Sequence, residues 1–522
     1  MNLLKSALAV SSMTMLSRIT GLMRETITAR VLGASAVSDA FFIAFRIPNL
    51  LRRLFAEGAF SQAFIPILSQ VYAKDGKPAS LELARRAISL LFLVVLVIAA
   101  IGTLGASWVV MGIASGLQVG SAQWELTVRL TQWMFPYIVF ISMVALASGL
   151  LNTYRSFSLP AFAPVLMNVS FIGGALFLIP YFEQPVFAMA FSVMLGGVLQ
   201  VVVLWFGLWR SGAWLNPFAG LGRLREAFAD ERVHRILKNM VPASLAVSVA
   251  QISLIINTNI ASHLAKGSVS WISFGDRLME FPTALLGVAL GTVLLPSLSA
   301  AATRSHADYS NLLDWGLRLT LALALPAAVG LGVFSEALVS MLFHYGRFDA
   351  TDVTMTSHAV MAYSVGLLGL VLVKILAPGF YAKQDVRTPV KIGVMVVVVT
   401  QLMNLVWVPI FGHAGLPLSV GLGASLNAGV LYLGLRKRGL YTPSQGWLAY
   451  SVRIGIAAAL MGALLFWANH YFDWIALAAH PVLRLLEGLG LIVAAALLYF
   501  AALTAMGMHP KKLLSRPAKI ED

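Results

Sequence analysis

Seven basic residues lie within stretches that are otherwise long and apolar enough to cross a membrane. They are Arg18, Arg24, Arg46, Arg52, Arg53, Arg277 and Lys374. A charged side chain near the centre of a bilayer costs about 2.5–3.5 kcal/mol on insertion scales, so it usually faces an ionic partner or a water-filled cavity. Arginine also offers a planar fork of N–H donors that matches phosphate and carboxylate groups. These residues therefore predict that the chain binds an anion within the membrane.

Acidic residues on the same stretches offer the competing interpretation, in which the buried charges only neutralise one another. At 100° per residue, four charged side chains between positions 37 and 68 fall within about 40° of one another on one helix face. They are Asp39, Arg46, Arg53 and Glu57, with Arg52 to one side. The candidate ion pairs are Arg46 with Asp39, Arg53 with Glu57, and Arg277 with Asp276 or Glu280.

The number of charges decides between these interpretations. Six arginines stand against four acids, which leaves about two positive charges without a fixed partner in a space of low dielectric constant. Glu25 would reduce this excess to one if it faced the same space. A cavity with excess positive charge is expected to bind a polyanion. Lys374 is interpreted as a helix-packing or snorkelling residue, and Arg46 ranks below Arg52 and Arg53 as a substrate contact.

The composition places these residues in a polytopic membrane protein. Of 522 residues, 59% are apolar and 11% are charged, against roughly 45–50% and 25% in globular domains. This excludes an ordinary soluble enzyme. The absence of cysteine excludes disulfides and thiolate metal sites. About 14 stretches are long enough for transmembrane helices, near residues 8–32, 37–68, 87–113, 126–152, 159–181, 186–209, 239–264, 269–300, 311–335, 355–381, 390–411, 415–435, 447–470 and 482–507.

The distribution of basic residues predicts the orientation of the chain. With a cytoplasmic N-terminus, about 25 basic residues fall in cytoplasmic segments and five fall in the opposite loops. The five are Arg30, Arg129, Lys266, Arg347 and Arg484. This bias follows the positive-inside rule, and an even number of helices places both termini in the cytoplasm. The net charge of +15 therefore indicates membrane orientation more than nucleic-acid binding.

Internal repetition predicts a transporter architecture. Residues 192–212 align with 419–439 and share about ten identities in the 21 positions. Units of six helices return the chain to its starting side, so two parallel repeats with substrate between them are expected. The predicted domains are residues 1–212 as the first lobe, 213–238 as an amphipathic interlobe linker, 239–439 as the second lobe, 440–507 as two further helices and 508–522 as a basic cytoplasmic tail.

Five segments resemble the MurJ (MviN) family of lipid II flippases. They are Ser11–Arg18, Ser38–Phe42, Pro48–Phe64, Asp276–Pro282 and Leu376–Tyr381. Two specific motifs are Asn49-Leu-Leu-Arg-Arg53 and Asp276-Arg-Leu-Met-Glu-Phe-Pro282, and the similarity covers essentially the whole chain. The resemblance implies the fold of the multidrug/oligosaccharidyl-lipid/polysaccharide (MOP) exporter superfamily, which is an all-α membrane fold of two six-helix lobes plus two C-terminal helices.

The resemblance also implies a function. Members of this family move lipid II, the undecaprenyl-diphosphate-linked peptidoglycan precursor, from the inner to the outer leaflet of the bacterial cytoplasmic membrane. By motif, Arg18, Arg24, Arg52, Arg53 and Arg277 would bind the diphosphate and headgroup, and Asp39, Glu57, Asp276 and Glu280 would be ionic partners and gate residues. The two C-terminal helices, near residues 447–470 and 482–507, would form the groove for the polyprenyl tail. Transport would be coupled to membrane potential or an ion gradient, and further partners would be other cell-wall synthesis proteins.

Other functions fit the sequence less well. A lipid-processing enzyme would need a nucleophile or a metal cluster, but the nine histidines are scattered and no metalloprotease, nucleophile-elbow or nucleotide-binding motif occurs. No cofactor or metal site is therefore expected. The alternatives within transport are a flippase for another polyprenyl-linked oligosaccharide and a MATE-like antiporter of the same fold. A cationic cavity argues against cationic drugs as substrates, but it does not exclude other lipid-linked oligosaccharides.

Overall fold

The computed structural model describes residues 3–51, 53, 61–216, 226 and 229–509 of the chain. Every regular element in these ranges is helical, which confirms the all-α class. Nine helical spans of the described residues are long and apolar enough to cross a membrane. They are Gln62–Leu104, Ala122–Thr153, Ser158–Tyr181, Pro185–Arg210, His306–Val333, Ala350–Ala382, Arg387–Lys437, Trp447–Tyr471 and Pro481–Ala505. The number of 14 transmembrane helices stays a prediction.

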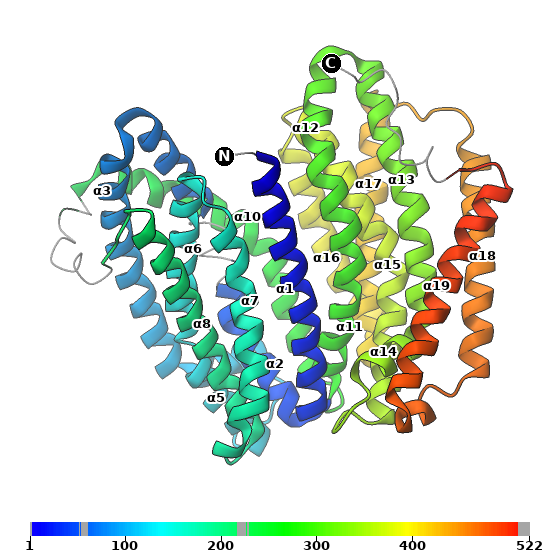
Figure 1. Cartoon of the computed structure of the whole chain (residues 1–522), viewed down its shortest axis with the longest axis horizontal. Coiled ribbons are helices and arrows are strands. Elements are labelled where there is room, and N and C mark those ends of the chain that lie inside the picture. The colour runs from blue at the N-terminus through cyan, green and yellow to red at the C-terminus, as the bar shows by residue number, and fades with distance from the viewer. Residues whose placement is uncertain (1–2, 52, 54–60, 217–225, 227–228, 510–522) are drawn as a thin grey trace. The chain divides into compact units, whose positions relative to one another are not determined.

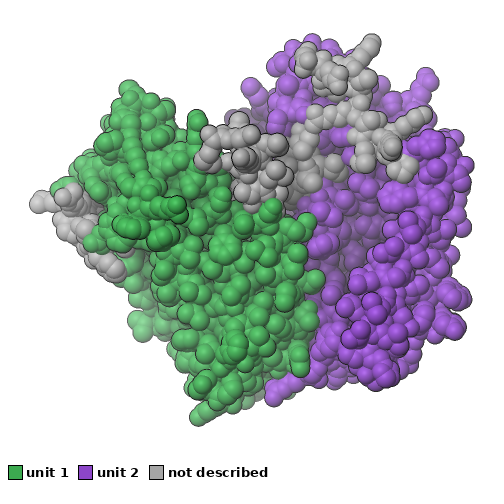
Figure 2. Space-filling model, viewed as in Figure 1, with its two compact units in different colours: residues 1–269 green, residues 270–522 purple. Residues whose placement is uncertain are grey.

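The chain divides into two compact units, Met1–Val269 and Ser270–Asp522, which Figure 2 colours separately. The first unit contains α1 (Leu3–Leu32), α2 (Ala36–Leu51), α3 (Ser61–Leu104), α4 (Ala106–Ile113), α5 (Ala122–Met134), α6 (Tyr137–Thr153), α7 (Ser158–Gly173), α8 (Pro185–Arg210) and α10 (Glu231–Ser262) (Figure 1). A π-helical turn, Gly174–Leu178, and a 3-10 turn, Ile179–Tyr181, follow α7.

The second unit contains the remaining helices. They are α11 (Ser268–Pro282), whose first two residues belong to the first unit, α12 (Ala289–Arg304), α13 (His306–Val333), α14 (Ser335–Phe343), α15 (Ala350–Ala382), α16 (Arg387–Phe411), α17 (Gly415–Lys437), α18 (Trp447–Tyr471) and α19 (Pro481–Ala505). A π-helical turn, Thr283–Val288, joins α11 to α12, and short 3-10 turns occupy Gly412–Ala414 and Ala476–Ala479.

Local sequence signals fix several helix ends. Ser121 is the N-cap of α5, and its side chain accepts a hydrogen bond from the backbone N–H of Trp124. Asp349 and Asp352 form a capping box at the start of α15. Gly76 has a φ angle of 79°, in the left-handed region, so it kinks the 44-residue helix α3. This kink lies in the segment that the sequence assigned to a cytoplasmic loop.

Two predicted segments differ from the observed elements. The apolar stretch 37–68 is divided between α2, which ends at Leu51, and α3, which begins at Ser61. Much of the predicted amphipathic linker lies outside the described residues. Its last residues, 231–238, are continuous with the membrane helix that was expected to begin at 239, and together they form α10.

Helix α10 is attached to the rest of the first unit at both of its ends. At its N-terminus, Asp230 accepts a hydrogen bond from the Arg86 guanidinium of α3 at 2.6 Å, and a second ion pair of 3.2 Å also joins α10 to α3. Burial alone would raise the pKa of Asp230, but the bonds from Arg86 and from the first backbone N–H groups of α10 lower it. At the other end, the backbone N–H of Gly116 donates to the Ser262 hydroxyl at 3.1 Å.

Matching helix bounds support the predicted duplication. The C-termini of α3 and α13, the N-termini of α4 and α14, and the N-termini of α7 and α16 are all separated by the same length of chain. The C-termini of α1 and α10 have nearly the same separation. By this spacing α10 is the counterpart of α1, although it packs in the first unit. The compact units and the predicted lobes therefore divide the chain at different places, and the lobe boundaries stay a prediction.

Local geometry repeats in the two segments that the sequence alignment pairs, 192–212 and 419–439. Ser192 in α8 and Ser419 in α17 each donate their hydroxyl to the carbonyl four residues earlier, at 2.7 and 2.9 Å. Gly212 and Gly439, which follow these two helices, have φ angles of 65° and 64°. A left-handed glycine after the last helical turn ends a helix without a Cβ clash. The identities at these positions thus have the same structural cause in both halves.

A buried aspartate ties the C-terminal helix pair to the rest of the second unit. Asp314 in α13 accepts hydrogen bonds from the side chains of Arg318, Tyr441, Ser444 and Trp447, and from the backbone N–H of Ser444. These bonds provide the partners that a buried carboxylate needs. Helix α18, which stands outside the predicted repeats, is thereby packed on α13. Helix α19 is joined to α13 by another bond, in which the hydroxyl of Tyr499 donates to the carbonyl of Ala322 at 2.6 Å.

Candidate substrate-binding site

Arg24 is fixed by the packing of α1 against α7. Its guanidinium donates to the carboxylate of Glu25 at 2.5 Å and to Oδ1 of Asn168 at 3.2 Å. It also lies 5.3 Å from the centroid of the Phe171 ring. The Arg24 side chain is 13% exposed and that of Glu25 is 8% exposed. Glu25 is therefore buried beside Arg24 and removes one positive charge from the excess that the sequence predicts.

Asn168 organises this cluster because it bonds to α1 at three places. Its Nδ2 donates to the carbonyl of Ser17 and to the hydroxyl of Thr20, both at 3.0 Å, while its Oδ1 accepts from Arg24. Asn168 is not among the site residues predicted from the sequence. A single amide within the apolar stretch 159–181 was the signal that could have found it, because a polar group inside a membrane helix seeks a hydrogen-bond partner on another helix.

The other predicted arginines of the first unit are less constrained. Arg18 precedes Arg24 by six residues, which turn an α-helix by about 600°, so the two project from different faces of α1. Arg18 is half-buried and forms no ion pair with another described residue, and the exposed Arg53 likewise forms none. Arg52 and Glu57 lie outside the described residues, so their roles and the pair of Arg53 with Glu57 stay predictions.

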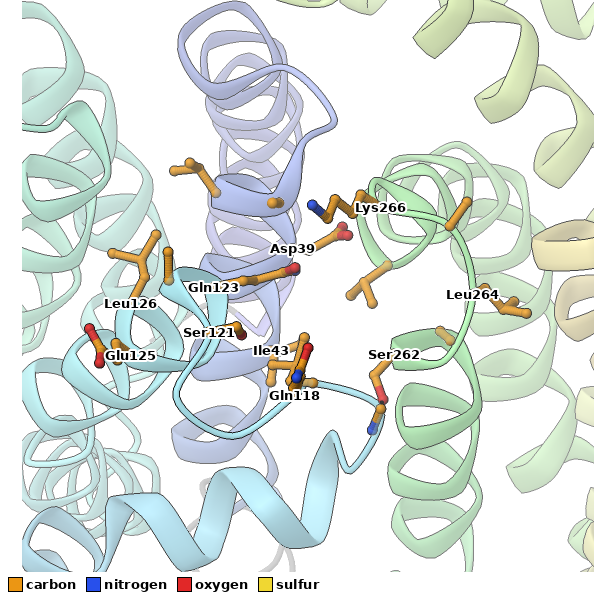
Figure 3. A pocket seen from close by; sticks show the side chains of 18 of the residues that line it. Asp39, Ile43, Gln118, Ser121, Gln123, Glu125, Leu126, Ser262, Leu264 and Lys266 are labelled. Atoms are coloured by element: carbon orange, nitrogen blue, oxygen red, sulfur yellow. Dashed lines mark hydrogen bonds between the residues drawn. The ribbon is translucent and has the colours of Figure 1, made fainter.

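Asp39 and Arg46, expected as partners on α2, both bond to the end of α10 or the loop that follows it. Asp39 is 3% exposed and accepts a hydrogen bond from the backbone N–H of Gly267 at 2.6 Å. Arg46 donates to the hydroxyl of Thr258. Figure 3 shows Asp39 directed toward the loop that carries Lys266. Charged side chains of α2 thus hold the end of α10, while an ion pair of Asp39 with Arg46 stays a prediction.

In the second unit, Arg277 lies among acids on α11. It donates to Glu280 at 2.6 Å, which is one of the two pairs expected from the sequence. The two side chains are 36% and 49% exposed, so the pair is accessible to solvent. Asp276 is exposed next to it. Lys374 in α15 donates to the carbonyl of Thr283 at 3.2 Å, and its role as a packing residue stays a prediction.

Arg484 is a buried helical arginine, so its predicted position in a loop is wrong. It lies in the first turn of α19 and is fully buried. Its guanidinium donates to the hydroxyl of Ser340 and to the carbonyl of His344, both at 3.1 Å, and lies 4.8 Å from the ring centroid of Tyr345. Sequence gives no signal for this burial, because the partners lie far earlier in the chain.

Two features summarise the chemistry of the predicted site. Each unit presents arginine beside glutamate, with Arg24 and Glu25 buried and Arg277 and Glu280 accessible. Among the described residues, no group of three or more His, Asp or Glu side chains could hold a metal ion. The arrangement suits the binding of an anionic group by guanidinium donors.

Comparisons with known sequences identify the family. The matching family model is described as lipid II flippase MurJ and covers residues 28–483. A relative from Burkholderia cenocepacia, named lipid II flippase MurJ, is 54% identical over 97% of this chain and 98% of its own length. A relative from Vibrio cholerae, named probable lipid II flippase MurJ, is 38% identical over 98% of this chain and 97% of its own length.

Comparisons with solved structures agree with the fold. A structure titled lipid II flippase MurJ, inward closed conformation, matches with a TM-score of 0.76 at 21% identity, over 95% of this chain and 99% of that chain. An inward-facing MATE multidrug transporter of the MOP superfamily matches with a TM-score of 0.67 at 15% identity, over 83% of this chain and 98% of that chain. At these identities the likeness shows the fold alone. The near full-length sequence matches show more: this polytopic membrane protein belongs to the MurJ family of lipid II flippases.

Proposed function

We propose that this chain is a lipid II flippase, a transporter rather than an enzyme, of the bacterial inner membrane. It moves the undecaprenyl-diphosphate-linked peptidoglycan precursor from the inner to the outer leaflet. The observation that carries the proposal is 54% identity, over 97% of the chain, to a relative named for this activity. Guanidinium groups within the helices supply the chemistry that an anionic headgroup needs in a medium of low dielectric constant.

The diphosphate and headgroup would be bound by five arginines: Arg18, Arg24, Arg52, Arg53 and Arg277. Arg18 supports this role because it is half-buried and has no ion pair within the described part of the chain. Arg24 is held in place by Asn168 and Phe171, so it would lose little conformational entropy on binding. A guanidinium has five N–H donors, so Arg24 keeps donors for phosphate beyond its bonds to protein.

The acidic residues would act as exchangeable partners and gate residues: Asp39, Glu57, Asp276 and Glu280. The accessible pair of Arg277 with Glu280 supports this role. An exposed ion pair contributes only about 0–1 kcal/mol, so a phosphate that binds more strongly can replace Glu280. Substrate binding would neutralise the positive charge of the cavity and favour closure on the cytoplasmic side, as alternating access requires.

The C-terminal helices would bind the polyprenyl tail. Both α18 and α19 expose large apolar side chains, among them Leu448, Phe466, Leu486 and Leu497. Such a surface lets the tail stay in lipid while the headgroup crosses. Membrane potential would contribute about 2.3 kcal/mol per unit charge per 100 mV. The potential or an ion gradient is therefore the proposed energy source.

Complementation of a strain depleted of its own flippase tests this function. The wild-type chain should restore growth and the appearance of lipid II in the outer leaflet. Arg18→Ala should lower translocation at least about tenfold, because it removes charge-assisted bonds to the diphosphate. Arg18→Lys should be intermediate, because lysine keeps the charge but loses the fork.

Arg85→Ala is the matched control, since Arg85 is an exposed arginine outside the predicted cavity. All variants must be present in the membrane at wild-type levels. Full translocation by Arg18→Ala would refute the role of Arg18, and failure of the wild-type chain to restore lipid II translocation would refute the function. Restored export of another polyprenyl-linked oligosaccharide, or of a cationic drug, would identify the alternative transporter instead.

A further inference from the structure

A cavity of about 700 Å³ lies within the first unit, apart from the arginine cluster of α1 and α7. The N-termini of α2, α5 and α8, the loop after α4 and the loop after α10 line it. In the predicted orientation these ends all lie on the outer side of the membrane. The volume falls within the range of roughly 300–1,000 Å³ that is typical of small-molecule sites.

Four charged side chains line the cavity, and their charges sum to zero. They are Asp39, Glu125, Arg129 and Lys266. In the described part of the chain, Glu125, Arg129 and Lys266 form no ion pair. The guanidinium of Arg129 lies over the ring of Phe187, 5.3 Å from its centroid, so its forked edge stays available to a ligand.

The charges are arranged as one carboxylate and one cation at each of two places. Asp39 and Lys266 are close together, because Asp39 accepts a hydrogen bond from the backbone N–H of Gly267. Glu125 and Arg129 are one turn apart on α5. In Figure 3, Glu125 and Lys266 appear on opposite sides of the view. A ligand that uses both places must carry positive and negative groups along an extended body.

Between these charges the wall offers amide groups and apolar surface. Gln118, Gln123 and Gln184 line the cavity with side chains that both donate and accept hydrogen bonds, as peptide groups do. Ile43 and Leu126 add apolar contacts. A neutral sugar would leave all four charges without an ionic partner. A diphosphate would gain no net attraction, because the two carboxylates offset the two cations.

We propose that this cavity binds a short zwitterionic peptide. The molecule that carries this peptide follows from the proposed function, because a peptidoglycan precursor has a peptide beside its sugars. This peptide occupies the cavity when the headgroup of the precursor reaches the outer side of the membrane. The cavity is then an exit subsite that holds the peptide, while the arginines of the membrane interior hold the diphosphate.

The absence of cysteine allows a direct binding test. Gln123→Cys places one thiol in the cavity wall, and its rate of reaction with a maleimide is measured on the purified full-length protein. The tripeptide Ala-Glu-Lys with free termini should slow this reaction, whereas its acetylated and amidated neutral analogue Ala-Gln-Gln, N-acetylglucosamine and inorganic diphosphate should not. Tyr181→Cys is the control, because Tyr181 is 82% exposed and does not line the cavity.

Variants that remove one charge from the cavity wall then test whether these charges bind the peptide. Adding Glu125→Gln or Arg129→Gln should raise the peptide concentration needed for half-protection by about tenfold each, the effect of losing one charge-assisted bond. No protection by the free peptide, or equal protection by its neutral analogue, would overturn the proposal. Unchanged half-protection in both charge variants would overturn it as well.

A second experiment identifies the molecule that carries the peptide. In proteoliposomes, lipid II should slow labelling of Gln123→Cys, and undecaprenyl diphosphate without headgroup should not. Protection by the free peptide but not by lipid II would overturn the assignment to the headgroup in favour of free outer peptides. Labelling requires no transport. If complementation succeeds but lipid II does not slow the labelling, the exit subsite is rejected and the flippase function is retained.

Discussion

At the scale of single residues, the predicted arginines differ in how far the fold already holds them. Arg24 donates to Glu25 and Asn168 and is almost buried, whereas Arg18 is half-buried without an ion pair in the described part of the chain. A guanidinium held in one orientation can define where a phosphate binds, and an unpaired one can supply the attraction. We therefore expect Arg24 to position the diphosphate and Arg18 to contribute more to its affinity.

Asn168 should be essential for the position of Arg24. Asn168→Leu keeps the volume but removes all three bonds to α1, so the carbonyl of Ser17 and one Arg24 donor lose their partner. Buried groups without a partner cost about 1–3 kcal/mol each, so thermal unfolding in detergent should occur several degrees lower. Asn311→Ala, an exposed amide in α13, should leave the midpoint unchanged. Equal midpoints for Asn168→Leu and wild type would show that this cluster does not stabilise the first unit.

Asp385, after α15, predicts an acid dependence of stability. Its bonds with Thr388, followed by its ion pair with Arg438 at 2.5 Å, lower the pKa of Asp385 to about 2. A depressed carboxyl pKa adds stability at pH values above about 4, and this stability is lost as the pH falls through about 2. Asp385→Asn should therefore unfold at a lower temperature than wild type at pH 7, and the gap should narrow below pH of about 4.

The matched control for this pH dependence is Asp308→Asn. The backbone N–H of Asp308 donates to the Ser305 hydroxyl, but its carboxylate forms no hydrogen bond or ion pair with another described residue. The thermal unfolding temperature of Asp308→Asn should equal that of the wild type at every pH. A gap for Asp385→Asn that stayed constant down to a pH of about 2 would show that its charge does not contribute to folding.

At the scale of helices, small residues decide how closely the elements of the second unit pack. A Cβ atom at Gly366 in α15 would lie 1.9 Å from the Cα atom of Gly421 in α17. Membrane helices depend on such close contacts, because lipid offers no hydrophobic force to bring them together. The glycines in these helices are therefore packing residues, although the same residue type would weaken a helix in water.

Gly366→Ala should separate α15 from α17 and destabilise the protein by about 1–3 kcal/mol. Gly429→Ala in α17 is the matched control, because a Cβ at that position would have no atom within 4 Å apart from its chain neighbours and the adjoining backbone of α17. It should be neutral, or stabilising by up to about 1 kcal/mol, since alanine favours helix more than glycine. Thermal unfolding of the two purified variants measures the difference. A smaller loss for Gly366→Ala than for Gly429→Ala would contradict the packing argument.

At the scale of the whole molecule, the basic residues predict which side of the membrane each end of the helices faces. Val119, in the loop after α4, is 66% exposed, and Arg304, at the end of α12, is also exposed. The positive-inside rule places Val119 outside and Arg304 in the cytoplasm. In intact cells, a maleimide that cannot cross the inner membrane should label Val119→Cys and not Arg304→Cys. After lysis it should label both. Labelling of Arg304→Cys alone in intact cells would invert the proposed direction of transport.

The sequence alone indicates the fold class, the family and the internal duplication of this protein. Apolar composition and charge distribution require a polytopic membrane protein, and the motifs around Arg53 and Arg277 identify the family. The alignment of 192–212 with 419–439 predicts a duplication, and the two segments share local geometry, such as the left-handed Gly212 and Gly439. These properties follow from residue type and spacing along one chain, which the sequence contains directly.

The pairing of buried polar groups follows from the three-dimensional packing of the chain and not from its sequence pattern. The bond of Asn168 to Arg24 spans 144 residues, and that of Gly267 to Asp39 spans 228. The burial of Arg484 by the segment around His344, and the packing of α10 in the first unit, also depend on such distant contacts. Helical periodicity states which face a residue occupies, but it does not state which helix covers that face. Close packing of distant segments makes that choice, and it also creates the mixed-charge cavity that no single segment contains.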